Sequence, residues 1–273
     1  MVFDVAALFL RRILRLLIAI GYSCYHVCST PGVSVKTKYT LMKWSEFLTS
    51  SVGKKFVMAL TGLFLISFLI IHVGLNACIF NDLPIFDEND NGDMFNRAAH
   101  FMGSSWVIRA LEYVLFAGFI LHIIQGYLLE VKNLSRRGVG YNISVGNKAS
   151  KWYSRTMGLL GTLLLLFLIM HIAHFWVPSR ITGLEEIEGK NYHNLFQRMV
   201  DVFQNPFIVL LYVLGCISLA YHLLHGFQSA FRTLGVHNSR YIRLIKATGA
   251  GFSIIVPLIF ALMPISIHFG WIG

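Results

Sequence analysis

The chain has 273 residues, of which 56% are hydrophobic and 13% charged, with a mean hydropathy of +0.64 and a formal net charge of +10 at pH 7. This composition lies outside the range of soluble globular domains and predicts a multi-pass membrane protein. Most of the basic residues lie before the first apolar run and in two of the connections between runs, so no nucleic acid partner is needed to explain the positive charge.

The first 41 residues precede any run suited to crossing a bilayer. Phe3–Ile20 is apolar, but three arginines near its middle argue against a spanning helix or a signal peptide: Arg11, Arg12 and Arg15. The segment predicts a basic amphipathic helix at the membrane surface. A second hypothesis is that translation starts at Met42, where MKWSEFLTSS forms a polar lead into the first run. The predicted division is an N-terminal segment at 1–53 and a membrane domain at 54–273.

Five apolar runs follow, each long enough to cross about 30 Å of hydrocarbon at about 1.5 Å per residue. They are Phe56–Phe80, Trp106–Val131, Thr156–Val177, Pro206–Phe231 and Ala247–Phe269. None shows the sustained alternation of a barrel strand. The sequence therefore predicts an all-α membrane protein with five transmembrane helices, the first four forming an antiparallel bundle.

Basic residues gather in alternate connections. They lie before the first run, between the second and third, and between the fourth and fifth: Lys36, Lys38, Lys43, Lys54, Lys55, Lys132, Arg136, Arg137, Lys148, Lys151, Arg155, Arg232, Arg240, Arg243 and Lys246. The other two loops are acidic or mixed, with Asp82, Asp87, Glu88, Asp90, Asp93, Glu185, Glu186 and Glu188. Because basic loops stay inside, we expect a cytoplasmic N-terminus and an outer C-terminus. The basic face suits either anionic lipid or a docked protein.

Histidines occur in each of the first four runs: His72, His122, His171, His174, His222 and His225. Ionisable residues at bilayer depth are costly, and the default interpretation of them is functional. A single buried histidine is readily explained by a hydrogen bond to a neighbouring carbonyl or hydroxyl. Histidines in four consecutive runs instead predict a shared ligand.

The distance of each histidine from the nearest basic residue sorts them by depth. His72 and His171 lie about 25 and 24 Å from the expected cytoplasmic edge, whereas His122 and His222 lie about 15 Å from it. His174 and His225 fall about 28 and 10 Å from that edge. Depth therefore pairs His72 with His171 and His122 with His222, at levels about 10 Å apart.

Glycines repeat at matched distances from these histidines. Gly62 and Gly161 lie ten residues before His72 and His171, and Gly126 and Gly226 lie four residues after His122 and His222. A glycine on a histidine's helix face leaves room for a bulky group, although small residues also serve helix packing. Two pairs of imidazoles facing across a four-helix bundle, with cleared space beside them, suit two haem b groups.

Two other ligand chemistries fit less well. Zinc requires more protein ligands or an open position at each site, and the spans supply no carboxylate or thiolate at these depths. A proton-relay transporter more often carries acidic residues within its spans, whereas Glu112 and Glu130 lie near span ends.

Four stretches carry a resemblance to a known family: GLFLISFLIIHVGLN, NRAAHFMGSSWVIRALEYVLFAGFILHIIQGY, GTLLLLFLIMH and YHLLHGFQSAFRTLG. Together they resemble the cytochrome b-558 family, the single-chain, five-helix, dihaem membrane anchors of succinate dehydrogenases and fumarate reductases. The resemblance covers about residues 50–245 and rests on the four-histidine set with its glycine spacings.

The resemblance implies a role for each histidine. His72 and His171 match the ligands of the distal haem iron, and His122 and His222 match those of the proximal haem iron. The family's fourth ligand precedes a glycine by four residues, which favours His222 over His225, as depth does. His174 and His225 are then neighbours of the ligands or surface residues. Arg198 resembles an arginine that binds a haem propionate in some members, and its alternative role is an interfacial anchor.

The implied function is an electron carrier of a succinate:quinone oxidoreductase in a bacterial cytoplasmic membrane. The implied partners are an iron–sulfur subunit and a flavoprotein with FAD; FAD and the iron–sulfur clusters belong to those subunits. The quinone, menaquinone in most dihaem members, is expected near the distal haem. Candidates there are His100, Arg97 and Arg109, since a histidine exchanges protons at working pH. His100 is alternatively a solvated loop residue, and Arg109 alternatively pairs with Glu112 one turn away.

One position departs from the family. Some fumarate reductases carry an acidic residue two positions before the fourth ligand, implicated in proton return, and this chain has Ala220 there. That proton pathway is therefore not expected here. The rival functions are a cytochrome b anchor of another quinone-linked oxidoreductase, such as a hydrogenase or formate dehydrogenase, and a haem-free membrane transporter.

Overall fold

A computed structural model describes residues 50–87, 89–137, 156–187, 189–236 and 238–272. Most of the predicted N-terminal segment lies outside these residues, as do Glu88, Glu188 and the basic residues Lys148, Lys151 and Arg155. Within the described part the chain is helical, with one isolated bridge between Glu186 and His193 and no strand.

Five helices are long and apolar enough to cross a membrane, as the sequence predicts. They are α3 (Ser51–Asn76), continued by a 3₁₀ turn at Ala77–Asp82, α5 (Trp106–Arg137), α7 (Met157–His171), continued by π-helical turns at Ile172–Trp176 and Pro178–Thr182, α9 (Pro206–Thr233) and α10 (Ser239–His268). The chain is thus an all-α, multi-pass membrane protein. The fifth helix starts at Ser239 rather than Ala247, because Asn238 caps it by accepting a hydrogen bond from the Arg240 amide (2.9 Å).

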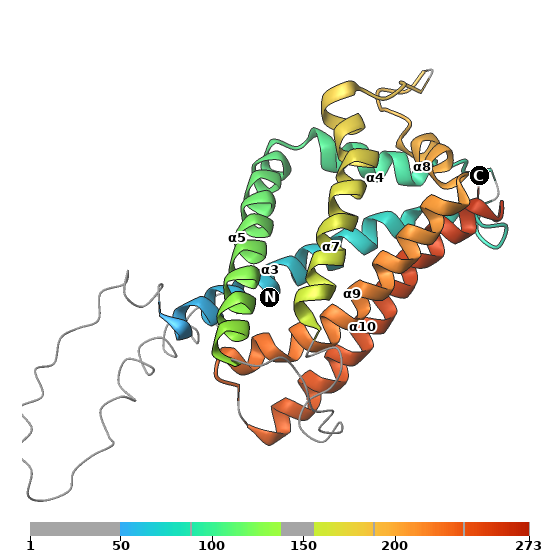
Figure 1. Cartoon of the computed structure of the whole chain (residues 1–273). Helices are drawn as coiled ribbons and strands as arrows, with labels where there is room; N and C mark the ends of the chain where they lie inside the picture. Colours follow the sequence, from blue (N-terminus) through green and yellow to red (C-terminus); the bar gives the residue numbers. More distant parts are fainter. Residues whose placement is uncertain (1–49, 88, 138–155, 188, 237, 273) are drawn as a thin grey trace, which may run out of the picture. The chain divides into compact units, whose positions relative to one another are not determined.

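Local sequence accounts for the starts of the other long helices. Ser50 caps α3 by accepting a hydrogen bond from Gly53 N at 3.0 Å. Asn205 caps α9 by accepting from Phe207 N at 3.0 Å, and Pro206 occupies the first turn, where its missing N–H costs nothing. Successive spans alternate in direction, so α3, α5, α7 and α9 form an antiparallel bundle, and α10 lies alongside α9 (Figure 1).

Two short helices that the sequence did not predict close one end of the bundle: α4 (Asp93–Ser104) and α8 (Leu195–Phe203) (Figure 1). Asn96, only 1% exposed, joins them, because its Oδ1 accepts from Phe196 N (2.9 Å) and its Nδ2 donates to Asn194 (3.1 Å). Gly92 precedes α4 at φ +72°, and a Cβ there would come within 2.1 Å of the Phe196 ring. Only glycine fits this turn.

Apolar packing is concentrated at this α4/α8 end rather than along the middle of the bundle. The core cluster contains Ile79, Phe95, Phe196, Met199, Val202, Phe203, Val209, Tyr212, Met263, Ile267 and Ile272. Along their most apolar stretches, α9 and α10 bury 33% and 39% of residues, whereas α5 and α7 each bury 6%. The helix pair α9/α10 is therefore the firmest part of the spanning region.

Gly215 provides a test of the α7/α9 contact. A Cβ at Gly215 would lie 2.5 Å from Phe167 Cδ2, and Phe167 is held between the His171 ring (5.7 Å) and the Tyr212 ring (5.2 Å). We expect Gly215→Ala to destabilise the protein by about 1–3 kcal/mol, as overpacking does. Thermal unfolding in detergent measures this.

Gly251→Ala is the matched control, since nothing lies within 4 Å of a Cβ at Gly251 on α10. It should be neutral or slightly stabilising, because alanine favours helix. Equal losses of stability in both variants would contradict the close α7/α9 packing.

Candidate functional site

Two pairs of histidines face each other inside the bundle. His72 on α3 and His171 at the end of α7 have ring centroids 5.9 Å apart with planes at 87°. His122 on α5 and His222 on α9 have centroids 6.2 Å apart at 63°. Each pair joins two helices that run in the same direction, and the pairs are those that the sequence predicts from depth.

The glycines of α3 and α7 mark the spacing between the two levels. A Cβ at Gly62 would lie 3.4 Å from His122 Cε1, and one at Gly161 would lie 4.0 Å from His222 Cε1. Both glycines thus lie beside the His122–His222 pair, whereas the histidines of their own helices, His72 and His171, lie ten residues further along the chain. Ten residues of helix rise about 15 Å, so the levels are further apart along the helices than the 10 Å predicted.

The other two glycines differ from each other. A Cβ at Gly126 would lie 3.5 Å from Met58 Cε, whereas a Cβ at Gly226 would meet nothing within 4 Å. All four paired histidines retain intermediate exposure although they lie within the spans. The space beside His222 is therefore open toward the basic end, the bundle end that carries Lys54, Lys55, Lys132, Arg232 and Arg240.

Helices α5 and α7 touch at their ends and part in the middle. Toward the basic end, Tyr127 Oη lies 2.9 Å from Thr162 Oγ1, which itself donates to Gly158 O. Toward the α4/α8 end, Glu112 accepts from the Trp176 indole and from Arg180 (3.0 Å).

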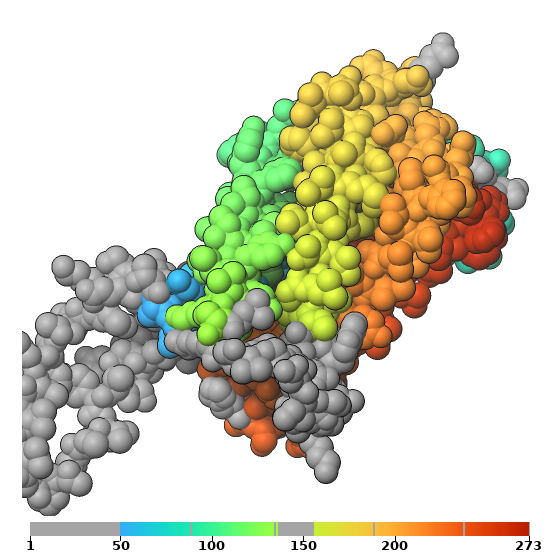
Figure 2. Space-filling view, in the orientation of Figure 1, coloured from blue at the N-terminus to red at the C-terminus, as the bar shows by residue number. Residues whose placement is uncertain are grey.

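Residues between these two contacts on the same helix faces are exposed. Ile120 on α5 is 56% exposed, and Leu166 and Ile169 on α7 are 60% and 58% exposed. Figure 2 shows a narrow furrow between the two helices on the face that it draws. The helices that carry His122 and His171 are therefore held apart halfway along.

The four paired histidines differ in the hydrogen-bond partners of their ring Nδ1 atoms. His122 Nδ1 lies 3.2 Å from Thr61 Oγ1, and His72 Nδ1 lies 3.3 Å from the Asn76 amide nitrogen, which also donates to His72 O (2.8 Å). The Nδ1 atoms of His171 and His222 are buried and have no hydrogen-bond partner. A buried polar atom without a partner is costly unless another group satisfies it.

The second histidine of α7 belongs to a different contact. His174 Nδ1 lies 3.0 Å from Tyr212 Oη, and the two rings are stacked at 9°. Arg198 on α8 donates from Nε to the His174 carbonyl at 3.0 Å, within the π-helical turn. Tyr212, 5% exposed, also contacts the His171 ring with centroids 6.1 Å apart. His174 and Arg198 thus lie one turn beyond the His72–His171 level.

The three predicted quinone-site residues lie on two helices, Arg97 and His100 one turn apart on α4 and Arg109 on α5, and each has a different partner. Arg97 forms an ion pair with Asp93 (2.9 Å) and is 66% exposed, His100 is exposed beside the Tyr192 ring (5.8 Å), and Arg109 donates from Nε to Gly103 O (3.3 Å). The alternative pairing of Arg109 with Glu112 is wrong, because Arg180 and the Trp176 indole take the Glu112 carboxylate instead.

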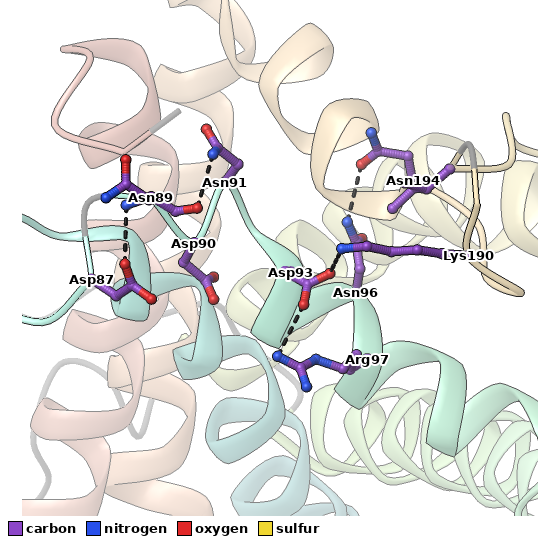
Figure 3. A pocket seen from close by; sticks show the side chains of 10 residues that line it. Asp87, Asn89, Asp90, Asn91, Asp93, Asn96, Arg97, Lys190 and Asn194 are labelled. Atoms are coloured by element: carbon purple, nitrogen blue, oxygen red, sulfur yellow. Dashed lines mark hydrogen bonds and ion pairs between the residues drawn. The ribbon is translucent and has the colours of Figure 1, made fainter.

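A polar pocket of about 440 Å³ lies over the α4/α8 end (Figure 3). Its lining includes Asp87, Asn89, Asp90, Asn91, Asp93, Asn96, Arg97, Ile187, Lys190 and Asn194. Asp93 points toward Lys190 and Arg97 and also accepts from the Tyr192 hydroxyl. The Lys190 hydrogen bond, followed by that of Tyr192, holds the pKa of Asp93 below its usual 3.8.

Chemically, each histidine pair can hold one metal between two imidazoles. Within the described ranges no group of three or more His, Cys, Asp or Glu side chains is placed to hold a metal ion, so a metal here would need its remaining ligands from elsewhere. No family model, curated protein or solved structure matches the chain.

Three contacting residues escaped the sequence analysis: Thr61, Asn76 and Tyr212. Asn76 follows His72 by four residues, and Thr61 adjoins Gly62, so helix spacing offered a signal for both. Tyr212 had none, because its contact with His174 depends on how α7 packs against α9.

The Asp93 contacts predict a response to acid at the loop around Lys190. A carboxylate with a lowered pKa stabilises the folded state above pH 3.8, and that contribution is lost as the pH falls through the lowered pKa. We expect the protection factors for amide hydrogen exchange in residues 189–193, taken relative to the intrinsic exchange rate at each pH, to fall in that range. In Asp93→Asn, protection should already be low at neutral pH and should change little on acidification.

Asp201→Asn is the control, since Asp201 is exposed on α8 and accepts a side-chain hydrogen bond from Gln197 (2.9 Å), four residues away on the same helix. The Asp93 contact has no part in holding the loop if the two variants exchange alike.

Proposed function

We propose that this protein is a dihaem cytochrome b anchor that carries electrons between an iron–sulfur subunit and quinone in a bacterial cytoplasmic membrane. The observation that carries the proposal is the pair of cross-bundle histidine contacts, at two levels and on four different helices. The sequence resemblance to dihaem anchors of succinate dehydrogenase and fumarate reductase supports the same function.

The spacing of the rings fits a metal ligated from two sides. Metal–imidazole bonds of about 2 Å place the ring centres of two opposed ligands about 6 Å apart. The observed 5.9 and 6.2 Å agree with that value. The open space at Gly226 and the parted middle of α5 and α7 supply room for a flat group beside the rings.

Haem iron with two histidine ligands accepts and releases one electron, and the protein tunes it through ligand orientation and burial. His72 and His171 would hold the distal iron, and His122 and His222 the proximal iron. The chain's part is to keep these imidazoles neutral and opposed within an apolar bundle from which bulk water is excluded. Arg198, held on the His174 carbonyl, retains terminal guanidinium nitrogens to bind a haem propionate.

The basic end is the proposed docking face for the iron–sulfur subunit, which in turn binds the FAD flavoprotein. In the part of the chain that the structure describes, the ion pairs join Asp93 to Arg97, Asp93 to Lys190 and Glu112 to Arg180, all away from that end. The basic side chains at Lys54, Arg232 and Arg240 thus remain available to an acidic partner or lipid headgroups. In this proposal the basic end faces the cytoplasm, with the N-terminus inside and the C-terminus outside.

The quinone, which we propose to be menaquinone, would bind toward the α4/α8 end. His100, Arg97 and Arg109 lie on α4 and the start of α5 at that end and reach the surface. An exposed histidine can give and take the protons that quinone chemistry requires.

The proposal predicts a difference between the two histidines of YHLLHG. His222→Ala should lower the haem content from two per chain to one, because it removes a ring opposed to His122. His225→Ala should leave two haems per chain, since the His225 ring does not face any of the four paired histidines. Pyridine haemochrome assay with a redox difference spectrum of the purified chain measures both.

Two outcomes refute the proposal. A wild-type chain without b-type absorbance is not a cytochrome, and a transporter becomes the better hypothesis. A haem loss confined to His225→Ala would show that the wrong ring was assigned. Co-purification with an iron–sulfur and a flavin subunit separates the proposed complex from other quinone-linked oxidoreductases.

A further inference from the structure

Thr61 contacts one of the four paired histidines through its hydroxyl oxygen. Among the described residues it is the only side chain whose oxygen faces the Nδ1 atom of a paired histidine. Its hydroxyl donates to Val57 O at 2.9 Å and lies 3.2 Å from Met58 O, so its hydrogen is directed at its own helix. The oxygen lone pairs are left to face His122 Nδ1 at 3.2 Å. With the hydroxyl hydrogen on a helix carbonyl, the ring is the donor in this contact and carries its hydrogen on Nδ1.

A neutral imidazole carries one N–H, so protonation of Nδ1 leaves the lone pair on Nε2. The tautomer of His122 is thereby set for binding a metal through Nε2. The other three histidines lack this arrangement: His171 Nδ1 and His222 Nδ1 are unpartnered, and His72 Nδ1 faces an amide nitrogen. The two levels therefore differ in how the protein holds its ligands.

We propose that Thr61 is a positioning residue that fixes the tautomer of His122 and lowers the reduction potential of the haem held by His122 and His222. This inference rests on the proposed function. When a neighbouring oxygen accepts a hydrogen bond from the Nδ1–H of a ligating imidazole, the imidazole donates more electron density to the metal. This favours the oxidised metal and lowers its reduction potential. The effect reaches the proximal haem alone, because Thr61 contacts no other paired histidine.

A purely structural role for Thr61 is the competing explanation. Threonine hydroxyls commonly bond the carbonyl four residues back within a helix, and that bond alone requires no ligand. Thr61→Val removes the hydroxyl and keeps the branched shape, whereas Thr61→Ser keeps the hydroxyl. If the shape of the side chain matters, valine should behave as the wild type and serine should not. If the hydroxyl matters, the reverse is expected, and the control below separates its intrahelical bond from its contact with His122.

Thr233→Val is the matched control. Thr233 ends α9, the helix that carries His222, donates to the carbonyl four residues back (Ser229 O) at 2.9 Å, and has no histidine partner among the described residues. The same substitution there removes the same intrahelical bond without touching a ligand.

The experiment is an optical redox titration of the purified full chain in detergent. The titration step that disappears in His222→Ala identifies the proximal haem. We expect Thr61→Val to keep two haems and to shift that step alone to higher potential, Thr61→Ser to titrate as the wild type does, and Thr233→Val to leave both steps unchanged. An unshifted step in Thr61→Val, or an equal shift in Thr61→Ser, overturns the inference.

A second measurement does not depend on haem. Nitrogen-15 NMR of the histidine-labelled, haem-free chain reports which ring nitrogen is protonated, with the His122 signals identified by their loss in His122→Gln. We expect His122 to carry its hydrogen on Nδ1 in the wild type and to lose this preference in Thr61→Val. A wild-type Nε2–H ring overturns the role of Thr61, whereas a wild-type chain that takes up no haem overturns the proposed function and the potential shift with it.

Discussion

The central constraint on this protein is that imidazoles inside a membrane must find partners, since lipid offers none. Four helices each bring one histidine to the bundle interior, and the rings meet as two pairs at 5.9 and 6.2 Å. The alternating directions of the helices bring these rings opposite one another at two heights, with Gly62 beside His122 and open space at Gly226.

The apolar packing that stabilises the bundle is concentrated at one end and not along its middle. The apolar core lies at the α4/α8 end, and α9 and α10 form the most closely packed helix pair. Helices α5 and α7 are joined by polar contacts at Glu112 and Tyr127 instead of a continuous apolar interface. The candidate site adjoins this core at one level, because the His171 ring lies beside Phe167 and the core residue Tyr212.

Sequence predicted the features that follow from hydrophobicity and helical rise: the five spans and the pairing of the histidines in level. It missed α4 and α8, because short amphipathic helices give weak patterns beside long apolar runs. The alternative pairing of Arg109 with Glu112, drawn from helix spacing, is wrong, because the fold brings Arg180 to Glu112 from the helical extension of α7. The roles of His72, His122, His171 and His222 as metal ligands remain a proposal, as do those of His100, Arg97 and Arg109 in quinone binding.

The contacts of Glu112 and Tyr127 have a consequence for assembly. Because α5 and α7 are tied near both ends, the width of the interior is set by the protein before anything enters it. A rigid, flat ligand of matching size would immobilise few side chains when it binds, so its binding would cost little conformational entropy. Loss of either the Glu112 or the Tyr127 contact would leave the histidines on their helices. It would remove the constraint on the distance between α5 and α7, and with it the fixed shape of the space beside the histidines.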